Sequence, residues 1–119
     1  MRNELRLLLT AADLWNEGHE QFHGYDLARH LAHAEDGTSI MSQPTLYRSL
    51  RRLEERGSLS SSWESLGEAA TAGREGRPRR YYAITNAGRA LAASELRDRK
   101  LSWSEGKLIN LPTPGNTSG

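Results

Sequence analysis

The sequence predicts one mainly α-helical domain that carries a small β-hairpin. The chain has 119 residues, a length that suits a single hydrophobic core. Its apolar residues include 17 Leu and 13 Ala, whereas Ile occurs three times and Val is absent. Because Leu and Ala favour helices and β-branched residues favour strands, this composition excludes a large sheet.

The same composition indicates a soluble, cytoplasmic protein. The absence of Cys excludes disulfide bonds, thiolate metal ligands and thiol catalysis, and it favours a reducing compartment. The longest apolar stretch, Leu5 to Leu14, is interrupted by Arg6 and Asp13 and is much shorter than the roughly 20 residues of a membrane span. We therefore expect no membrane contact and no signal peptide.

The first predicted helix is amphipathic and ends near Gly18. Leu7 and Leu14 lie on a second face, which a monomer would leave in water, so we expect them to contact a partner subunit. The main apolar stripe follows the spacing i, i+3, i+4, i+7 and i+10 and consists of Leu5, Leu8, Leu9, Ala12 and Trp15.

A second, short helix is expected from Tyr25 to His33, where the sharp entry is made by Gly24. A loop with the turn signal Asp36-Gly37 follows, with room for a short strand at Thr38 to Met41. The inward residues of the second helix are Leu27, Ala28, Leu31 and Ala32.

The third helix has the best-defined ends in the sequence. Ser42 can cap its N-terminus, Pro44 suits its first turn, and Gly57 stops it. At 100° per residue its leucines share one face and its arginines the other. The leucines are Leu46, Leu50 and Leu53, and the arginines are Arg48, Arg51 and Arg52.

Two alternating segments, Ser58 to Glu64 and Arg79 to Thr85, predict a β-hairpin. Tyr82 and Ile84 share one side of the second segment, and we expect Trp63, on the first, to pack beneath the hairpin. The intervening residues 65–78 are rich in Gly, Ala and Arg, which indicates a flexible basic tip.

Thr85 can cap a fourth helix that runs to about Lys100, before a tail rich in Pro and Gly. We therefore divide the chain into a domain at residues 1–89, a C-terminal helix at 86–104 that serves dimerisation, and a flexible tail at 105–119.

This order of elements predicts a winged helix-turn-helix with a flanking C-terminal helix, in which the third helix enters the DNA major groove and the hairpin is the wing. The charge distribution agrees with this interpretation. Residues 43–89 contain nine Arg and five acidic residues, whereas residues 1–42 contain three Arg and seven acidic residues. Guanidinium groups bind phosphates and base edges bidentately. An ordinary solvated surface is the alternative explanation of these charges. The candidate DNA-binding residues are Ser42, Gln43, Thr45, Arg48, Arg51 and Arg52 on the helix, and Arg74, Arg77, Arg79 and Arg80 on the wing.

Four segments between residues 22 and 89 resemble the PadR family of transcriptional regulators. They are Phe22-His23-Gly24-Tyr25-Asp26-Leu27, the stretch from Pro44-Thr45-Leu46-Tyr47-Arg48 to Arg56-Gly57, Trp63-Glu64, and the stretch from Gly76-Arg77-Pro78 to Gly88-Arg89. The resemblance implies a homodimer that binds operator DNA, usually as a repressor, with the third helix as recognition helix and Tyr47 near the DNA backbone. Spacing alone leaves Tyr47 open to a second interpretation, as a partly buried core aromatic.

Two features depart from the family pattern. Residues 16–22 are additional where family members have a tight turn, and only about 15 helical residues are expected after Thr85, where family members carry a longer dimerising element. A two-fold dimer would place its recognition helices on half-sites about 34 Å apart, and so requires a palindromic operator. The expected dimer contacts are Leu7, Leu14, Leu91 and Leu96, and packing within one chain is the alternative role of these leucines.

Two weaker signals concern ligands. Some family members bind flat aromatic compounds between interface tryptophans, so the resemblance suggests Trp15 and Trp103 as an effector pocket, although Trp more often anchors a core. His19 and His23 have a spacing that could hold zinc on a helix, but no Cys joins them, and we expect no metal and no cofactor.

An enzyme is not expected, because no nucleophile, base or nucleotide-binding loop accompanies the carboxylates. The leading interpretation is therefore a sequence-specific DNA-binding transcriptional regulator, a homodimeric repressor. The alternatives are a winged-helix adaptor that binds a protein partner, and an architectural DNA-binding protein without a repressor role.

Overall fold

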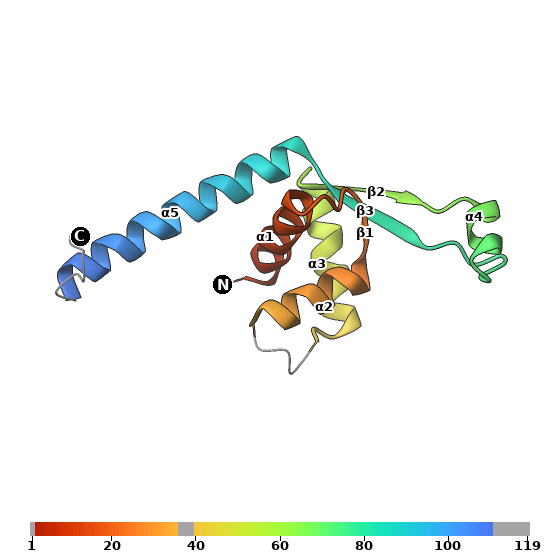
Figure 1. Ribbon diagram of the computed structural model, residues 1–119, viewed down its shortest axis with the longest axis horizontal. Helices are drawn as coiled ribbons and strands as arrows, with labels where there is room; N and C mark the ends of the chain where they lie inside the picture. The colour runs from red at the N-terminus through yellow and green to blue at the C-terminus, as the bar shows by residue number, and fades with distance from the viewer. Residues whose placement is uncertain (1, 36–39, 111–119) are drawn as a thin grey trace.

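The chain folds as five helices and three short strands in the part that the structure describes (Figure 1). In this computed structural model the backbone is described for residues 2–35 and 40–110, and the side chains for the same ranges up to residue 99. The elements are α1 (Asn3–Asn16), β1 (Phe22–His23), α2 (Gly24–Glu35), α3 (Gln43–Glu55), β2 (Leu59–Trp63), α4 (Leu66–Thr71), β3 (Arg80–Ile84) and α5 (Asn86–Asn110).

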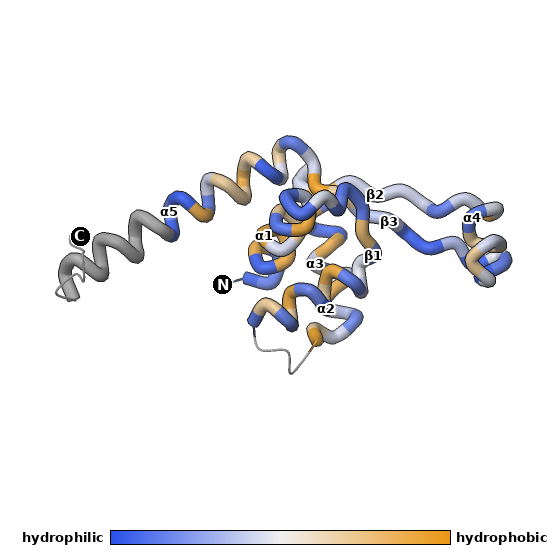
Figure 2. Tube along the Cα trace, viewed as in Figure 1, coloured by the Kyte–Doolittle hydropathy of each residue, from blue (hydrophilic) through white to orange (hydrophobic). Residues whose placement is uncertain are grey.

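The hydrophobic core lies where α1, α2 and α3 converge on the sheet (Figure 2). The prediction that Leu7 and Leu14 form an exposed second face of α1 is wrong, because they are only 0% and 3% exposed. Leu5 and Leu9, which were expected inside, are half-buried instead. The physical reason is that α1 carries Leu around most of its circumference and is packed against α2, α3, α5 and β3, so its periodicity does not select one face.

The start of α2 is fixed by close contact with α3. A Cβ atom at Gly24 would lie 2.8 Å from Cδ1 of Leu50 and 3.1 Å from Cε1 of Tyr47, so only glycine fits at this approach. The helix extends one residue before and two residues beyond the predicted Tyr25–His33 range. In the loop that follows, Ile40 and Met41 form no strand, and the rest of the strand predicted from Thr38 lies outside the described residues.

α3 follows the sequence prediction closely. The Ser42 side chain accepts a hydrogen bond from the Thr45 amide, Pro44 lies in the first turn, and Gly57 has φ +79° just beyond the C-terminus. Three leucines on one face are 0–3% exposed, as the helical spacing predicts: Leu46, Leu50 and Leu53.

The sheet has the order β1-β3-β2, with antiparallel pairs throughout. Tyr82 and Ile84, which share one side of β3, are buried, and the pairing of Phe22 with Tyr82 shows that the additional segment before α2 supplies a third strand. Trp63 is 62% exposed, so its predicted place beneath the hairpin is wrong. The hairpin extends beyond the body of the protein (Figure 1), and the Arg80 guanidinium lies over the Trp63 ring, 5.2 Å from its centroid.

Two boundaries differ from the sequence prediction. The wing tip is not simply a flexible loop, since it contains α4, which Ser65 and Glu68 begin with a reciprocal capping box. The C-terminal helix, α5, continues to Asn110, beyond the end expected near residue 100 and into the segment 105–119 that was expected to be a tail. Residues 111–119 lie outside the described part.

Candidate nucleic-acid interface

The outward face of α3 presents two arginines to solvent. Arg48 and Arg51 are exposed, and neither forms an ion pair or hydrogen bond within the part of the chain that the structure describes. The opposite face of the helix is anchored in the core, so these two guanidinium groups project from a rigid support. Such an arrangement can bind phosphates or guanine edges without first breaking interactions in the protein.

The N-terminus of α3 adds short polar side chains. Ser42 and Thr45 join their hydroxyl groups in a hydrogen bond of 3.0 Å, which fixes the first turn. Gln43 is exposed in the same turn. In winged and other helix-turn-helix proteins the first turn of the recognition helix contacts base edges, and the three predicted residues lie in or next to the first turn of α3.

On the wing side of α3 lies an open groove that combines aromatic rings with cations. Tyr47 is 41% exposed at its edge, which fits neither a core residue nor a fully solvated one. Arg51 and Arg79 supply the positive charge. Asp26 and Glu54 also line the groove, and they pair with Arg29 and Arg80 respectively. The aromatic lining consists of His23, Tyr25, Tyr47, Trp63 and Tyr82.

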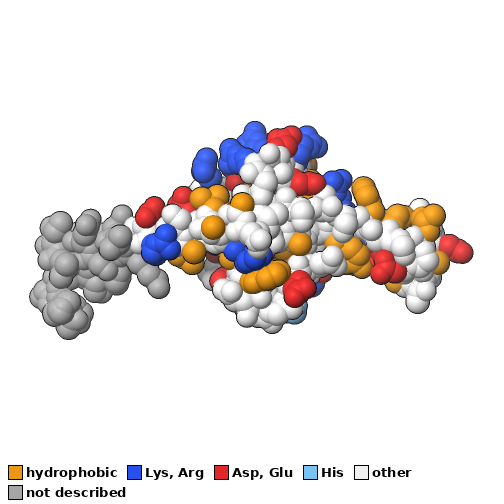
Figure 3. All heavy atoms as spheres, turned by 90° about the horizontal axis from the view of Figure 1, so that it is seen from above, with side chains coloured by type: hydrophobic (Ala, Val, Ile, Leu, Met, Phe, Trp, Pro, Cys, Tyr) orange, Lys and Arg blue, Asp and Glu red, His pale blue; other side chains and the backbone are white. Residues whose placement is uncertain are grey.

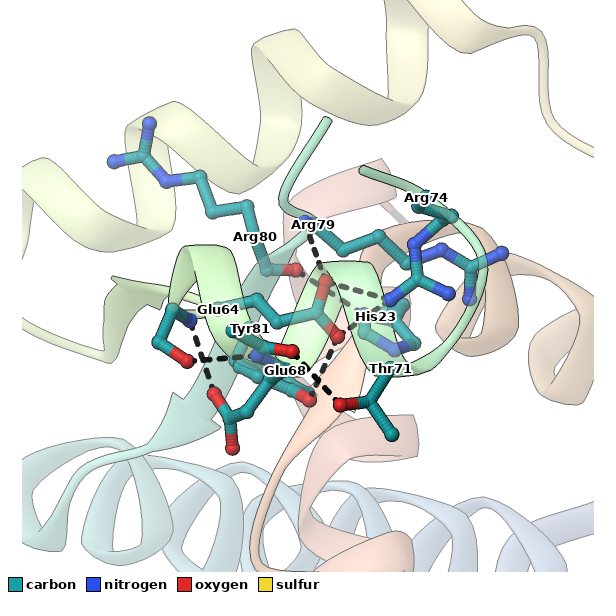
Figure 4. Close-up of polar contacts among 10 residues, drawn as sticks. His23, Glu64, Glu68, Thr71, Arg74, Arg79, Arg80 and Tyr81 are labelled. Atoms are coloured by element: carbon teal, nitrogen blue, oxygen red, sulfur yellow. Dashed lines mark hydrogen bonds and ion pairs between the residues drawn. The ribbon is translucent and has the colours of Figure 1, made fainter. Parts of the chain in front are cut away.

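Inside the wing, Glu64 accepts hydrogen bonds at its carboxylate from three polar groups (Figure 4). It is 6% exposed and accepts hydrogen bonds from the Arg74 guanidinium, from the Arg79 amide at 3.1 Å and from the Tyr81 hydroxyl at 3.3 Å. The hydrogen bonds from Arg74 and then Arg79 lower the pKa of Glu64 below its ordinary value. Burial, together with the neighbouring carboxylates, raises the pKa of Tyr81.

The four wing arginines therefore differ in what they can contact. Arg74 is bound to Glu64 and its side chain is only 23% exposed, so it does not project as the free cation that was expected. Arg80 is directed away from the Glu64 cluster and joins the wing to α3, donating to Ser61 at 2.7 Å and to Glu54 at 3.3 Å (Figure 4). Arg77 and Arg79 are exposed and remain for an external partner.

Comparison with known proteins agrees with this geometry. A family model described as the transcriptional regulator PadR-like family matches residues 16–94, more than half of the chain. A PadR family transcriptional regulator from Eggerthella lenta is 32% identical over 90% of this chain and 87% of that one, with a TM-score of 0.57.

The chain belongs to the PadR-like family of transcriptional regulators. It is a DNA-binding regulator of this family, and the family is not one of enzymes. Pex from Synechococcus is 29% identical over 86% of this chain and 84% of that one, with a TM-score of 0.53. A transcriptional regulator from Clostridium thermocellum, 24% identical over 87% and 86% of the two chains, shares the fold with a TM-score of 0.62. No match was found among curated proteins.

The residues predicted for the dimer interface and for the effector pocket differ in how exposed they are. Leu91 and Leu96 are each 43% exposed on α5, whereas Leu7 and Leu14 are buried within the single chain and cannot meet a partner. Trp15 is half-buried, and the Arg89 guanidinium lies over its ring at 4.0 Å from the centroid. The side chain of Trp103 lies outside the described residues.

His19 and His23 do not share a helix face, because His23 lies in β1 and stacks on Tyr81. Among the described residues, no group of three potential metal-binding side chains gathers, and no helix is long and apolar enough to cross a membrane.

Sequence reasoning missed two acidic residues of this PadR-like interface. Glu64 is the last residue of a predicted strand, and nothing in its local pattern shows that the wing folds back over it. Glu4 is 8% exposed and pairs with Arg52 and Arg56 across the interface of α1 and α3. The capping box of α4 was recognisable, since Ser65 and Glu68 have the required spacing.

Proposed function

We propose that the protein is a homodimeric repressor that binds a palindromic operator, with α3 in the major groove and the wing on the flanking backbone. The proposal rests on one main observation. Arg48 and Arg51 are exposed and unpaired among the described residues, on a helix whose other face is buried. Bidentate contacts from such side chains to guanine discriminate between bases by about 1–3 kcal/mol each.

The wing supports the same proposal. Arg77 and Arg79 are exposed on a hairpin that its own buried carboxylate holds in shape. We expect them to contact phosphates or the minor groove, in a manner that depends strongly on salt. Tyr47 lines the groove between α3 and the wing and is exposed, so we expect it to approach the DNA backbone.

The dimer in this proposal forms along α5. This helix extends away from the body (Figure 1) and exposes Leu91 and Leu96. On α1, the half-buried Leu5 and Leu9 replace Leu7 and Leu14 as the residues available to a partner. A two-fold pair would present two α3 helices to half-sites about 34 Å apart, which a palindrome supplies.

Three further parts of the proposal stay predictions. The repressor role rests on the family pattern, and a cytoplasmic location rests on the absence of Cys. An effector pocket for a flat aromatic compound at Trp15 and Trp103 requires that the Arg89 side chain leave the Trp15 ring or that the compound stack on the other face.

The test is a gel-retardation titration with duplex DNA from upstream of the protein's own gene. We expect discrete complexes, and we expect Arg48→Ala and Arg51→Ala each to weaken binding roughly tenfold or more at constant salt. Arg97→Ala, on α5, is the matched control and should bind as the wild type does. Circular dichroism verifies that each variant is folded. Unchanged affinity in both α3 variants would show that this helix is not the recognition helix.

A further inference from the structure

The flank of α3 that faces α1 carries a row of arginines. Arg48, Arg52 and Arg56 are spaced four residues apart, so they lie one above the other along the helix. Arg2, just before α1, lines the same shallow hollow, together with Asn3, Thr45 and Ser49. The wing lies on the other flank of α3, where Tyr47 and Glu54 border the aromatic groove.

Glu4 is the acidic residue that borders this hollow. Its carboxylate is 10% exposed and lies 3.0 Å from Arg52 and 3.7 Å from Arg56. The two arginine side chains remain 54% and 52% exposed. The hollow is therefore lined by four arginines and a single carboxylate, which pairs with two of them, and like charges at this spacing repel one another on a helix. The hollow is left with an excess of positive charge that an anion can neutralise.

We propose that this row is a second phosphate-binding surface for the DNA backbone, and that Glu4 positions Arg52 and Arg56 within it. The inference rests on the function proposed above and adds Arg2, Arg56 and Glu4 to the interface. A helix in the major groove has a phosphate backbone on each side, because that groove is only about 12 Å wide. The wing would contact one strand, and the arginine row would contact the other.

Positive charge is concentrated on part of the protein surface. Seen from above, positively charged side chains gather at one edge of the central body, with an acidic side chain among them (Figure 3). The forked guanidinium group suits the tetrahedral phosphate, and exposed arginines reach it without disturbing the buried core. Phosphate binding of this kind does not depend on base sequence.

The test compares variants that change the charge of the row in opposite directions. Arg2→Gln combined with Arg56→Gln removes two cations, and leaves Arg52 as partner of Glu4. Glu4→Gln removes the negative charge, and its amide oxygen can still accept a hydrogen bond from Arg52. Arg97→Gln, on α5, is the control. Each variant is titrated with the promoter duplex and with a random-sequence duplex over a range of salt concentrations, after its melting temperature has been measured.

We expect the double variant to bind both duplexes about threefold to tenfold more weakly, with a salt slope lower by about 0.9 for each phosphate that is no longer neutralised. Glu4→Gln should bind both duplexes more tightly at low salt. If both variants keep the wild-type affinity and salt slope while Arg51→Ala weakens binding, the arginine row does not contact DNA. The proposal that α3 is the recognition helix would then still hold. If the wild type binds neither duplex, the proposed function itself fails. Weaker binding of the promoter duplex alone would assign the row to base recognition and overturn the inference.

Discussion

Glu64 is an acidic residue in the basic half of the chain, and its position explains the shape of the wing. Arg74, Arg79 and Tyr81 donate hydrogen bonds to its carboxylate, and the Glu64 amide donates to the Arg79 carbonyl at 2.8 Å. The residues before and after α4 are thereby tied together. Arg77 and Arg79 lie between α4 and β3, in a segment whose backbone is hydrogen-bonded to Glu64 at Arg79.

The pairing of Glu64 predicts how the wing responds to pH. Because the pKa of Glu64 is lowered in the folded wing, its ionised form stabilises the wing above the pKa of the unfolded chain. That contribution is lost as pH falls through the lower, folded pKa. We expect Glu64→Gln to melt at a lower temperature than the wild type near neutral pH, with a difference that shrinks in acid.

Thermal unfolding over a pH series, followed by fluorescence of the three tryptophans, measures this difference. The exposed Glu75 is the control, since Glu75→Gln should change neither the melting temperature nor its pH dependence. A constant difference between wild type and Glu64→Gln at every pH would argue against the ion pair as the cause.

Single residues differ in how far their role could be predicted from the sequence. Arg48 and Arg51 were predictable, because helical spacing alone places them opposite the leucines of α3. Glu4 and Glu64 were not, because each is buried by a segment distant in sequence, and burial by a distant segment leaves no local pattern. Arg74 was misassigned for the same reason, since its partner Glu64 lies ten residues earlier.

At the scale of elements, α5 depends on a close approach to Ser58, the residue just before β2. A Cβ atom at Gly88 would lie 2.1 Å from the Ser58 carbonyl oxygen and 2.9 Å from Cγ1 of Ile84. The first of these is a backbone atom that also accepts hydrogen bonds from the Thr85 amide and hydroxyl. The start of α5 is therefore locked to the sheet, and no side chain can be inserted between them.

We expect Gly88→Ala to destabilise the protein by about 2 kcal/mol or more, although Ala is normally the better helix former. Gly67→Ala in α4 is the matched control, because its Cβ atom would meet only Ser65 Oγ at 3.9 Å. That variant should be neutral or stabilised by up to about 1 kcal/mol. Urea unfolding gives both values, and equal stability of the two variants would contradict the steric argument.

The elements with strong local signals were predicted well, and those that depend on packing were not. α3 has a cap, a first-turn Pro and a terminal Gly, so its ends were found from the sequence. The buried face of α1 was misjudged, since its Leu residues surround the helix and only tertiary contacts select a side. β1 has two residues, too few for any alternating pattern to be visible.

For the whole molecule, the predicted order of helices and hairpin led to the correct fold class, because the order limits how the elements can pack. The proposed quaternary arrangement, by contrast, does not follow from the order of the elements. The proposed dimer rests on exposed apolar residues of α5, and their exposure becomes apparent only once the buried side of that helix is known. Ala92 is 1% exposed and marks that buried side, whereas Leu91 and Leu96 lie outside it.

The proposed dimer predicts that a charge on α5 separates the subunits. Leu96→Glu places a carboxylate in the shared interface of both copies, so we expect the dimer dissociation constant to rise about 100-fold or more. Leu66→Glu is the control, because Leu66 is 67% exposed on the wing and should leave association unchanged. Analytical ultracentrifugation gives the mass of each variant. A Leu96→Glu protein that remains dimeric would place the interface elsewhere, whereas a folded monomer with weakened operator binding would show that the two recognition helices act as a pair.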